Sequence, residues 1–457
     1  MLGIDSSTQS SKAVLVDADE GAVVDELTAP HPAGTEVDPR AWLAAADTVT
    51  APLLDRAAAA AVGGQQHGMV ALDGDGEPVR AALLWNDTRS ASAVDQLIAE
   101  HGGPEACAEA VGSVLVASFT VTKLRWLRDH EPEHAARVER VLLPHDYVSA
   151  HLAAPGTAPF TDRGDASGTG YYSAREERWR PDLLEAALGR AAALPDVVAP
   201  GAVAGQARGG QVLGAGTGDN MAAALGMDLA PGDVLVSIGT SGVASTVSRT
   251  PVVDGSGTVT CFGDATGGYL PMVTTMNAAR ILDLQAALLG VDHEELAALA
   301  LSAPPGANGL TLLPYYGGER TPNRPLATGT WTGLRPTTTR ADLARAAYEA
   351  LLCSLADAVD LLSVQVPEKG RLLLVGGAAR SAAVRALAPA ILGRPVVVPP
   401  PGEYVALGAA RQAAWALAGT PAPPAWPDRG ADLLEADPQP EVRERYAELR
   451  DRTESWT

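Results

Sequence analysis

Residues 3–12 read GIDSSTQSSK, and residues 237–243 read SIGTSGV. Each stretch begins as an apolar strand and runs into a turn of small and hydroxyl-bearing residues. Around the first stretch, the segments LGID, KAVLVD and AVVDEL predict short strands joined by tight turns, a meander that opens an α/β domain. A second opening follows Pro231 and Gly232, where DVLVSIGTSGVASTVS repeats the order of strand, small polar turn and strand.

The two openings predict a duplicated fold. Placing residues 4–5 over residues 238–239 sets SSTQS beside TSG. A second correspondence follows in the same order, because the strand AAAAAV, ending at Val62, leads into two glycines, and the strand LLLV, residues 372–375, leads into two more. Two matches in one order favour a duplication over chance.

The length of the chain also indicates two domains. Its 457 residues exceed one ordinary core and suit two domains of roughly 200 residues each, with a cleft expected between them. The composition, 46% hydrophobic and 19% charged, can bury large cores. We set the domain boundaries at 1–228 and 233–457.

Three further segments carry structural signals. Asp38 and Pro39 form a good N-cap and N1 pair for a helix. The longest helix is expected to start near Thr339, with Asp342 in its first turn and one apolar face. The stretch PAPPAWPDRG, residues 421–430, predicts a linker before a charged C-terminal helix.

Charge and cysteine content exclude some classes of protein. A net charge of −21 argues against a nucleic-acid binder, which draws its affinity from Lys and Arg. Cys107, Cys261 and Cys353 have neither a disulfide nor a zinc spacing, which indicates a reducing compartment. No apolar run approaches the roughly 20 residues of a membrane span. We expect a cytoplasmic protein without a membrane or nucleic-acid partner; a homodimer is compatible with the sequence, which does not fix the oligomeric state.

Two of the polar turns could hold a nucleoside triphosphate. In GIDSSTQSSK, backbone amides and hydroxyls can cradle phosphate oxygens, and Asp5 at the strand end can hold a hydrated Mg²⁺. SIGTSGV offers similar donors. In LVGGAAR, residues 374–380, small residues at a helix start allow a nucleotide to approach the backbone closely. Taken singly, each is equally compatible with an ordinary turn or a close helix–strand contact.

Two other segments suit a polyol and its phosphorylation. AGTGDNMAAALG brings Asp219 to the start of an apolar helix, where the helix N-terminus favours a charged carboxylate. A simple helix N-cap is the alternative for this residue. GGQQHG, residues 63–68, places Gln66 and His67 in a loop after a buried strand, with the donors and acceptors that a polyol needs; a buried structural histidine is the competing interpretation.

Taken in order, these residues resemble the FGGY family of carbohydrate kinases, from the ATPase superfamily of actin, hexokinase and the heat-shock chaperones. SFTVTKLRWLRDH, residues 118–130, is similar to the first family signature, and GTWTGLRPTTTRADLARAAYE, residues 329–349, to the second. The resemblance covers the chain to about residue 415 and implies an α/β fold of two duplicated actin/hexokinase-like (ribonuclease H-like) domains flanking a cleft. The N-terminal domain would bind the sugar and the C-terminal domain the nucleotide.

The resemblance also implies an activity and a set of residues. The stretches GQQHG, LLWNDTR, LLPHDYV, TDRGDASGT and LLPYYGGERTPN are most similar to family members that phosphorylate ketopentoses, D-xylulose above all. Ribulose and glycerol are the alternative substrates; an actin- or chaperone-like ATPase and an inactive sugar sensor are the rivals from other classes. The implied roles are catalytic base for Asp219; sugar contacts for Gln66, His67, Asp219 and Asn220; ATP or phosphate contacts for Thr8, Gln9, Lys12, Thr240, Ser241, Gly376, Gly377 and Ala378; and Mg²⁺ for Asp5.

Two positions depart from the family pattern. Ser7 stands where many relatives have Gly in the phosphate loop, and Ala378 stands where a third Gly is usual in the nucleotide loop. Ser7 is expected to tighten or reshape the turn that would hold the phosphates. The second places a methyl group where adenosine would lie, which affects nucleotide affinity and base preference.

Overall fold

The computed structural model describes residues 1–427 and 429–456, which form two compact units. Unit 1 contains Met1–Leu229 and two later segments, Arg249–Leu270 and Gly402–Pro427; unit 2 contains Ala230–Ser248, Pro271–Pro401 and the described part of Asp428–Thr457. The chain therefore returns to unit 1 twice after leaving it. Asp428, inside the expected linker, lies outside the described residues, and the two-domain division at 228 and 233 stays a prediction.

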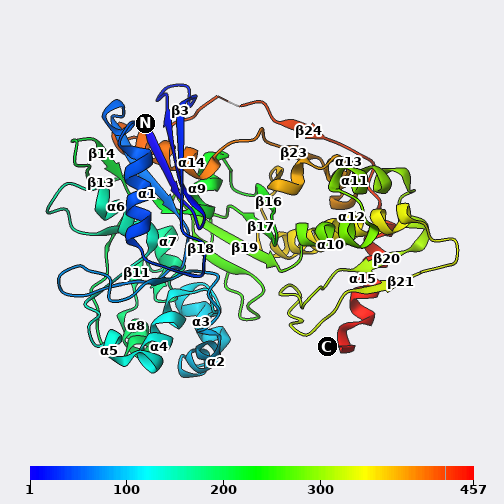
Figure 1. Ribbon diagram of the computed structural model, residues 1–457, viewed down its shortest axis with the longest axis horizontal. Helices are drawn as coiled ribbons and strands as arrows, with labels where there is room; N and C mark the ends of the chain where they lie inside the picture. The colour runs from blue at the N-terminus through cyan, green and yellow to red at the C-terminus, as the bar shows by residue number, and fades with distance from the viewer. Residues whose placement is uncertain (428, 457) are drawn as a thin grey trace. The chain divides into compact units, whose positions relative to one another are not determined.

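The sheet of unit 1 follows the order β13-β14-β5-β1-β2-β3, and β15 also pairs with β5. Figure 1 labels β3, β13 and β14 of this sheet. Strand β1 is antiparallel to β2 and parallel to β5. Its strands are β1 (Leu2–Ser6), β2 (Ser10–Val16), β3 (Val23–Pro30), β5 (Ala59–Gly64), β13 (Val203–Gln206), β14 (Val212–Gly214) and β15 (Thr217–Gly218).

Helices cover both faces of this sheet because successive side chains of a strand point to opposite faces. Ile4 packs in one cluster with Trp42 of α1 (Arg40–Thr50). On the other face, Val14 packs with Ala406 of α14 (Tyr404–Ala418). Helix α14 also touches α9 (Asp219–Gly226) so closely that a Cβ at Gly408 would lie 1.8 Å from the Ala222 carbonyl oxygen.

Unit 2 repeats the central strands of unit 1. Its strands follow the order β19-β17-β16-β22-β23-β24. Strand β16 is antiparallel to β17 and parallel to β22, as β1 is to β2 and β5. The predicted duplication is confirmed by this shared pairing. The strands are β16 (Val234–Ile238), β17 (Gly242–Thr246), β19 (Tyr269–Thr275), β22 (Leu372–Val375), β23 (Val396–Val398) and β24 (Asp432–Leu434).

Helix α12 (Arg340–Gln365) is the longest described helix, as predicted, and it begins after Thr339. Thr339 and Asp342 form a capping box, in which the Thr339 amide donates to Asp342 Oδ2 at 2.9 Å. The predicted face of α12 is buried from Ala347 to Leu362. One predicted cap is wrong by a residue: Pro39 is the N-cap of α1, and Asp38 instead accepts the Arg40 amide at 3.0 Å.

Within residues 1–427 and 429–456 no helix combines the length and apolarity needed to cross a membrane. The remaining α-helices and strands lie between the strands of the two large sheets, except α15, which follows the last of them. They are β4 (Glu36–Val37), β6 (Val70–Leu72), β7 (Ala82–Leu83), α2 (Ala91–Glu100), α3 (Pro104–Val111), α4 (Thr120–His130), α5 (Pro132–Ala135), β8 (Arg140–Leu142), α6 (Pro144–Leu152), β9 (Phe160–Asp162), α7 (Arg163–Ser167), β10 (Tyr172–Ser173), β11 (Arg178–Trp179), α8 (Pro181–Leu188), β12 (Asp196–Val198), β18 (Thr260–Gly263), α10 (Ala279–Leu289), α11 (His293–Ser302), β20 (Thr311–Leu313), β21 (Thr330–Thr332), α13 (Ala382–Leu392) and α15 (Pro440–Arg452).

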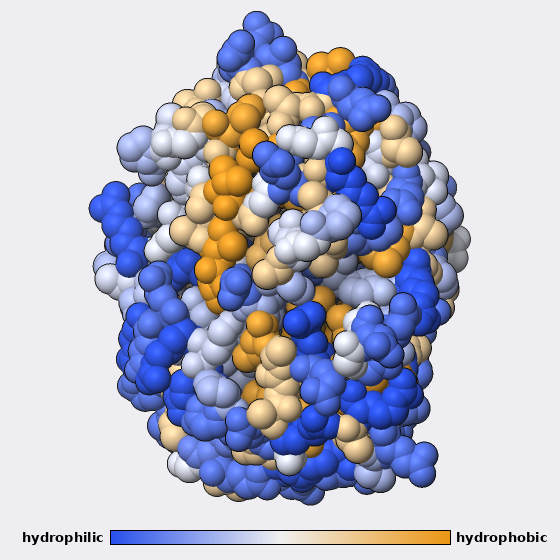
Figure 2. Space-filling model, turned by 90° about the vertical axis from the view of Figure 1, so that its left-hand side faces the viewer, coloured by the Kyte–Doolittle hydropathy of each residue, from blue (hydrophilic) through white to orange (hydrophobic). Residues whose placement is uncertain are grey.

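The surface is mainly polar on the face that Figure 2 shows, where apolar residues gather in a narrow stripe among hydrophilic ones. Large apolar side chains that are exposed in unit 1 include Val24 and Val203. Exposed apolar residues are ordinary on folded proteins. This surface therefore does not by itself indicate a partner.

Candidate active site

Two loops of unit 1 meet at the carboxyl end of β5. Gln66 follows β5 in a loop, as predicted, and Asn220 lies in the first turn of α9. The Asn220 side-chain amide donates to Gln66 Oε1 and to Asp219 Oδ1, each at 2.9 Å. Parallel pairing of β15 with β5 fixes this meeting, because Thr217 pairs with Gly63 and Gly218 with Gly64. The sugar-contacting residues expected from the sequence thus come together.

Gln66 has one buried hydrogen-bond donor without a partner among the described residues. Its side chain is 4% exposed, and Nε2 makes no hydrogen bond. Leaving a buried amide donor unsatisfied costs about 1–3 kcal/mol. A ligand hydroxyl that accepts from Nε2 would remove this cost, so the geometry suits a polyol at this point.

His67 is held in a defined tautomer and orientation. Its Nδ1–H donates to the Gly168 carbonyl at 2.8 Å, so that Nε2 is the acceptor nitrogen whenever the ring carries a single hydrogen. The ring packs against Phe119 and Phe262, with centroids 5.0 and 5.6 Å away. His67 is half-buried and its φ is 67°, a backbone conformation that favours Gly and Asn. These contacts hold the His67 ring in one orientation.

Asp219 is the first residue of α9, whereas the N-cap is Gly218. The N-cap interpretation of Asp219 is therefore wrong. Asp219 Oδ1 accepts the backbone amide of Asn220 at 2.8 Å. Burial raises the pKa of the Asp219 carboxyl to about 6, and the Asn220 donors oppose this rise. The expected low pKa is also wrong, because desolvation outweighs the helix N-terminus, yet the carboxylate is mostly ionised at pH 7.

Asp5 is the penultimate residue of β1, lies near Asp219 and is 5% exposed. Burial raises the pKa of the Asp5 carboxyl to about 7, the Asp219 charge adds to the rise, and Lys12 opposes it. Among the described residues, Asp5 Oδ1 has no hydrogen-bond donor. An unpartnered, buried carboxyl oxygen suits a cation, and Mg²⁺ commonly takes one or two carboxylates together with waters.

The turn after β1 contains the other expected phosphate contacts of unit 1. Thr8 Oγ1 donates to Gln65 Oε1 at 3.4 Å and accepts the indole hydrogen of Trp85 at 3.0 Å. Gln9 is exposed at the tip of the turn. Lys12 Nζ forms an ion pair with Glu403 Oε2 at 2.6 Å, just before α14. The turn thus presents Thr8 and Gln9, whereas Lys12 already has a carboxylate partner.

The Ser7 hydroxyl donates to the Ser10 carbonyl at 2.9 Å, and the Ser7 amide donates to the same oxygen at 3.0 Å. The serine that departs from the family pattern therefore tightens its own turn.

In unit 2 the two predicted nucleotide loops lie side by side. Gly376, at φ 96°, has no room for a Cβ, which would lie 2.5 Å from the Ile238 carbonyl oxygen. The turn between β16 and β17 is tied to α10, because the amides of Ala278 and Ala279 donate to Thr240 and Gly239 at 3.2 and 2.9 Å. The turn after β16 and the loop after β22 are thus held close together and form one rim.

This rim borders a pocket of about 840 Å³ within unit 2. Thr240, Gly377 and Ala378 line it, so the structure brings these three together; Ser241 and Gly376 are not among its lining residues. Helices α10 and α11 supply an apolar wall, including Leu282 and Leu301. The volume lies in the range of small-molecule and cofactor sites.

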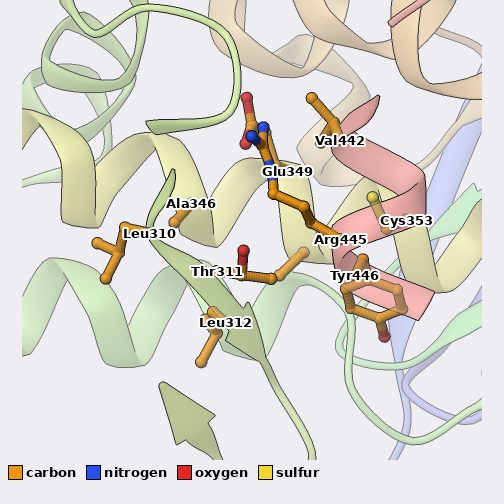
Figure 3. Close-up of a pocket in the computed structure, with 10 residues that line it drawn as sticks. Leu310, Thr311, Leu312, Ala346, Glu349, Cys353, Val442, Arg445 and Tyr446 are labelled. Atoms are coloured by element: carbon orange, nitrogen blue, oxygen red, sulfur yellow. The ribbon is translucent and has the colours of Figure 1, made fainter. Parts of the chain in front are cut away.

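A second cavity of unit 2 is much smaller, about 10 Å³. Figure 3 shows its lining side chains on β20, α12 and α15, among them Glu349, Arg445 and Tyr446. This volume is at most that of a single water molecule. It marks the packing of the charged C-terminal helix rather than a ligand site.

Comparison with known proteins shows the family. The FGGY carbohydrate kinase N-terminal domain matches residues 1–226, and the C-terminal domain matches residues 234–417. The chain belongs to the FGGY family of carbohydrate kinases. This confirms the resemblance in the two signatures and the actin/hexokinase-like fold, and it makes the protein a carbohydrate kinase rather than a chaperone or filament protein.

The chain is similar throughout to xylulose kinases. It is 46% identical over 435 residues to the xylulose kinase of Streptomyces coelicolor, covering 92% of this chain and 88% of that protein. It is 45% identical over 455 residues to the xylulose kinase of Streptomyces rubiginosus, covering 95% and 92%. The crystal structure of the xylulose kinase from Bifidobacterium adolescentis superposes with a TM-score of 0.92 at 44% identity, covering 98% and 99%.

Some residues of the site escaped sequence reasoning. Trp85, 45% exposed, contacts Thr8, although only its motif LLWNDTR was noted. Phe119 belongs to the first family signature and packs on His67. Tyr348 lies in the second signature and in the nucleotide-sized pocket, where its hydroxyl is 3.2 Å from Ser381 Oγ. The signatures were recognised as patterns, but which of their side chains face a site depends on the fold.

Proposed function

We propose that the protein transfers the γ-phosphate of ATP to a hydroxyl of D-xylulose, giving D-xylulose 5-phosphate and ADP. The observation that carries the proposal is the identity of 46% with a xylulose kinase over 92% of the chain. The Gln66–Asn220 contact beside Asp219 supports it, because it offers amide groups and a carboxylate to a polyol.

The proposed reaction assigns Asp219 as the base. Its carboxylate accepts the proton as the O–H bond of the sugar breaks and the same oxygen bonds to the γ-phosphorus, while the bond from phosphorus to the β,γ-bridging oxygen breaks and ADP leaves. The transition state is loose, so the protein contributes mainly positioning and electrostatic stabilisation. Gln66 and Asn220 orient the hydroxyl. A second sugar hydroxyl donates a hydrogen bond to Nε2 of His67.

The proposal extends to the nucleotide and a metal. Thr240, Gly377 and Ala378 line the 840 Å³ pocket, which we assign to the nucleoside part of ATP. Thr8, Gln9, Lys12 and Ser241 are proposed near the phosphates. Asp5 would hold Mg²⁺ through water, and the ion would neutralise phosphate oxygens during transfer.

The test is a panel of sugars in a coupled ADP-release assay, with D-xylulose, D-ribulose, L-ribulose and glycerol each at several concentrations. We expect the highest kcat/KM with D-xylulose and ATP turnover that rises several-fold over the sugar-free rate. A higher kcat/KM with a ribulose or glycerol would overturn the substrate assignment within the family. ATP turnover indifferent to every sugar would favour the inactive sensor.

A further inference from the structure

A cluster of buried charged residues lies next to the two segments that form the candidate sugar site of unit 1. His145 and Asp146 lie in the first turn of α6, and Asp165 lies in α7. All three side chains are fully buried. His145 Nδ1 is 3.1 Å from Asp146 Oδ1 and 3.3 Å from Asp165 Oδ2. None of the roles assigned above uses this cluster.

The contacts of the ring determine its charge. His145 Nε2 is 3.0 Å from the Ala215 carbonyl oxygen, an atom that can only accept. Nδ1 lies at ion-pair distance from two carboxyl groups, and an ionised carboxylate can only accept, so the arrangement favours a hydrogen on both ring nitrogens. Burial alone lowers the pKa of His145, but Asp146 and Asp165 outweigh it and raise the pKa well above the ordinary value.

Other titratable groups surround the ring, and burial raises the pKa of one of them, Asp165, to about 8, although its contact with His145 opposes this rise. Burial raises the pKa of the Asp162 carboxyl, whereas the His145 charge and hydrogen bonds from the Gly164 and Asp165 amides and the Thr217 hydroxyl oppose this rise. The Tyr171 hydroxyl stays neutral, because burial and then the charges of Asp146 and Asp165 raise its pKa. The charged groups that act most strongly on the ring are therefore the carboxyl groups of Asp146 and Asp165.

His145 lies close to both segments of the candidate site, but through different atoms. A Cβ at Gly64 would lie 2.8 Å from His145 Cβ, and a Cβ at Gly216 would lie 2.3 Å from His145 Nε2. Gly64 leads directly into the Gln66–His67 loop, whereas Gly216 precedes Asp219 by three residues. The backbone and Cβ of His145 thus pack against Gly64, whereas its ring packs against Gly216, on the segment that leads to Asp219.

Thr217 supplies a second anchor for the same segment. Its hydroxyl donates to Asp162 Oδ2 at 2.7 Å, two residues before Asp219. The Ala215 carbonyl therefore contacts His145, and the Thr217 side chain contacts Asp162, so the same group of buried charged residues holds both. A shift of about 1 Å in a catalytic group can cost 10²-fold in rate.

We propose that His145 is a protonated positioning residue for phosphoryl transfer, which holds the segment leading to Asp219 against one buried ion-pair cluster. This deepens the proposed function and rests on it. A divalent cation held by the same atoms is the competing explanation, because ligand atoms of His145, Asp146 and Asp165 all lie within 4.8 Å of one another. A bound metal would replace the proton at Nδ1.

The first experiment needs no activity, so it separates this inference from the proposed function. The side-chain ¹⁵N spectra of the histidine-labelled full chain are followed from about pH 6 to about pH 9, where an ordinary imidazole loses its proton. We expect one of the eight histidines to stay doubly protonated throughout, and purified protein to contain no stoichiometric metal. A complete set of neutral rings at the upper pH, or one equivalent of zinc, would overturn the inference.

The second experiment compares His145→Gln with His145→Lys. The Gln side chain can still donate to the Ala215 carbonyl but carries no charge, whereas Lys keeps a cation beside the carboxyl groups. We expect His145→Gln to lower kcat/KM for the sugar about 10–100-fold with unchanged ADP affinity, and His145→Lys to retain more activity. His151→Gln is the control, because His151 lies on the same helix but pairs with Asp47 at the surface.

The outcomes differ for a merely structural histidine. In that case His145→Gln would lower the melting temperature while the folded fraction kept its kcat, which would contradict a positioning role. Equal loss of activity in His145→Gln and His145→Lys would contradict the role of the charge. If neither variant folds, the protonation state in the wild-type spectra still decides the inference.

Discussion

Asn220 Nδ2 lies 2.9 Å from Gln66 Oε1, and this hydrogen bond joins the loop after β5 to the first turn of α9. The two residues are 154 positions apart in the chain. The same amide group also contacts Asp219 Oδ1 at 2.9 Å. The polar groups proposed for sugar binding and the proposed base are therefore one connected unit, and a change in one is expected to affect the others.

Gln66→Glu tests the unpartnered donor. A glutamate can still accept from Asn220, but it lacks the Nε2 hydrogens that we assign to a sugar hydroxyl. Loss of one such bond costs about 0.5–1.5 kcal/mol, so KM for the sugar should rise by about 2–13-fold with KM for ATP unchanged. Steady-state kinetics with Gln206→Glu, an exposed position of β13, gives the control. An unchanged sugar KM would contradict the assignment.

His67→Asn distinguishes a sugar-binding role of His67 from a purely structural one. Asparagine tolerates the φ of 67° and can keep a donor toward Gly168, but it has no counterpart of Nε2. We expect KM for the sugar to rise several-fold, and more in His67→Ala, which loses both groups. Kinetics and melting temperature are measured on the same preparations. A normal KM together with a clear fall in melting temperature would favour a purely structural histidine.

Asp5→Asn should make the protein more stable at neutral pH. Below about pH 4 the Asp5 carboxyl is protonated in both states; as the pH rises to about 7, only the folded state keeps the proton, so the free energy of unfolding falls. Asparagine does not titrate. Urea unfolding without Mg²⁺ should therefore show little difference at or below about pH 4 and a higher stability of the variant at pH 8, on the order of a few kcal/mol. Equal stability at pH 8 would contradict the raised pKa.

The Ala378 methyl group should weaken nucleotide binding. Ala378 lines the pocket assigned to ATP, next to Gly377, whose Cβ position meets no atom within 4 Å. We expect Ala378→Gly to lower KM for ATP several-fold and Ala378→Val to raise it, both with an unchanged KM for the sugar. Titration with ADP checks the same order of affinities. No change in either variant would place the nucleotide away from this residue.

Much of the fold could be predicted from local patterns. Strand periodicity and the glycines after β5 and β22 were sufficient to predict the duplication, because both units use the same strand pairing. The capping box at Thr339 fixed the start of α12. The return of α14 to the sheet of unit 1 could not be predicted, because it depends on a close contact of Gly408 with α9, about 180 residues earlier in the sequence.

The site was predictable in its loops but not in its electrostatics. The positions of Gln66, His67 and Asp219 after strand ends follow from the sequence. Their pKa values do not, because the sequence offered only the helix N-terminus, whereas burial raises the pKa of Asp219 to about 6. His145 was missed for a similar reason: LLPHDYV and TDRGDASGT were noted as motifs, but only the fold brings His145 to Asp165.

The central claim is that Asp219 is the catalytic base, and Asp219→Asn tests it most directly. Asparagine keeps the shape and can still accept the Asn220 amide at Oδ1, and it removes a carboxyl whose pKa burial raises. We therefore expect a melting temperature at pH 8 no lower than that of the wild type and an unchanged ADP affinity. The decisive measurement is kcat with D-xylulose on that same preparation: the account predicts a loss of about 10²-fold or more, and full activity in the stably folded variant would contradict it.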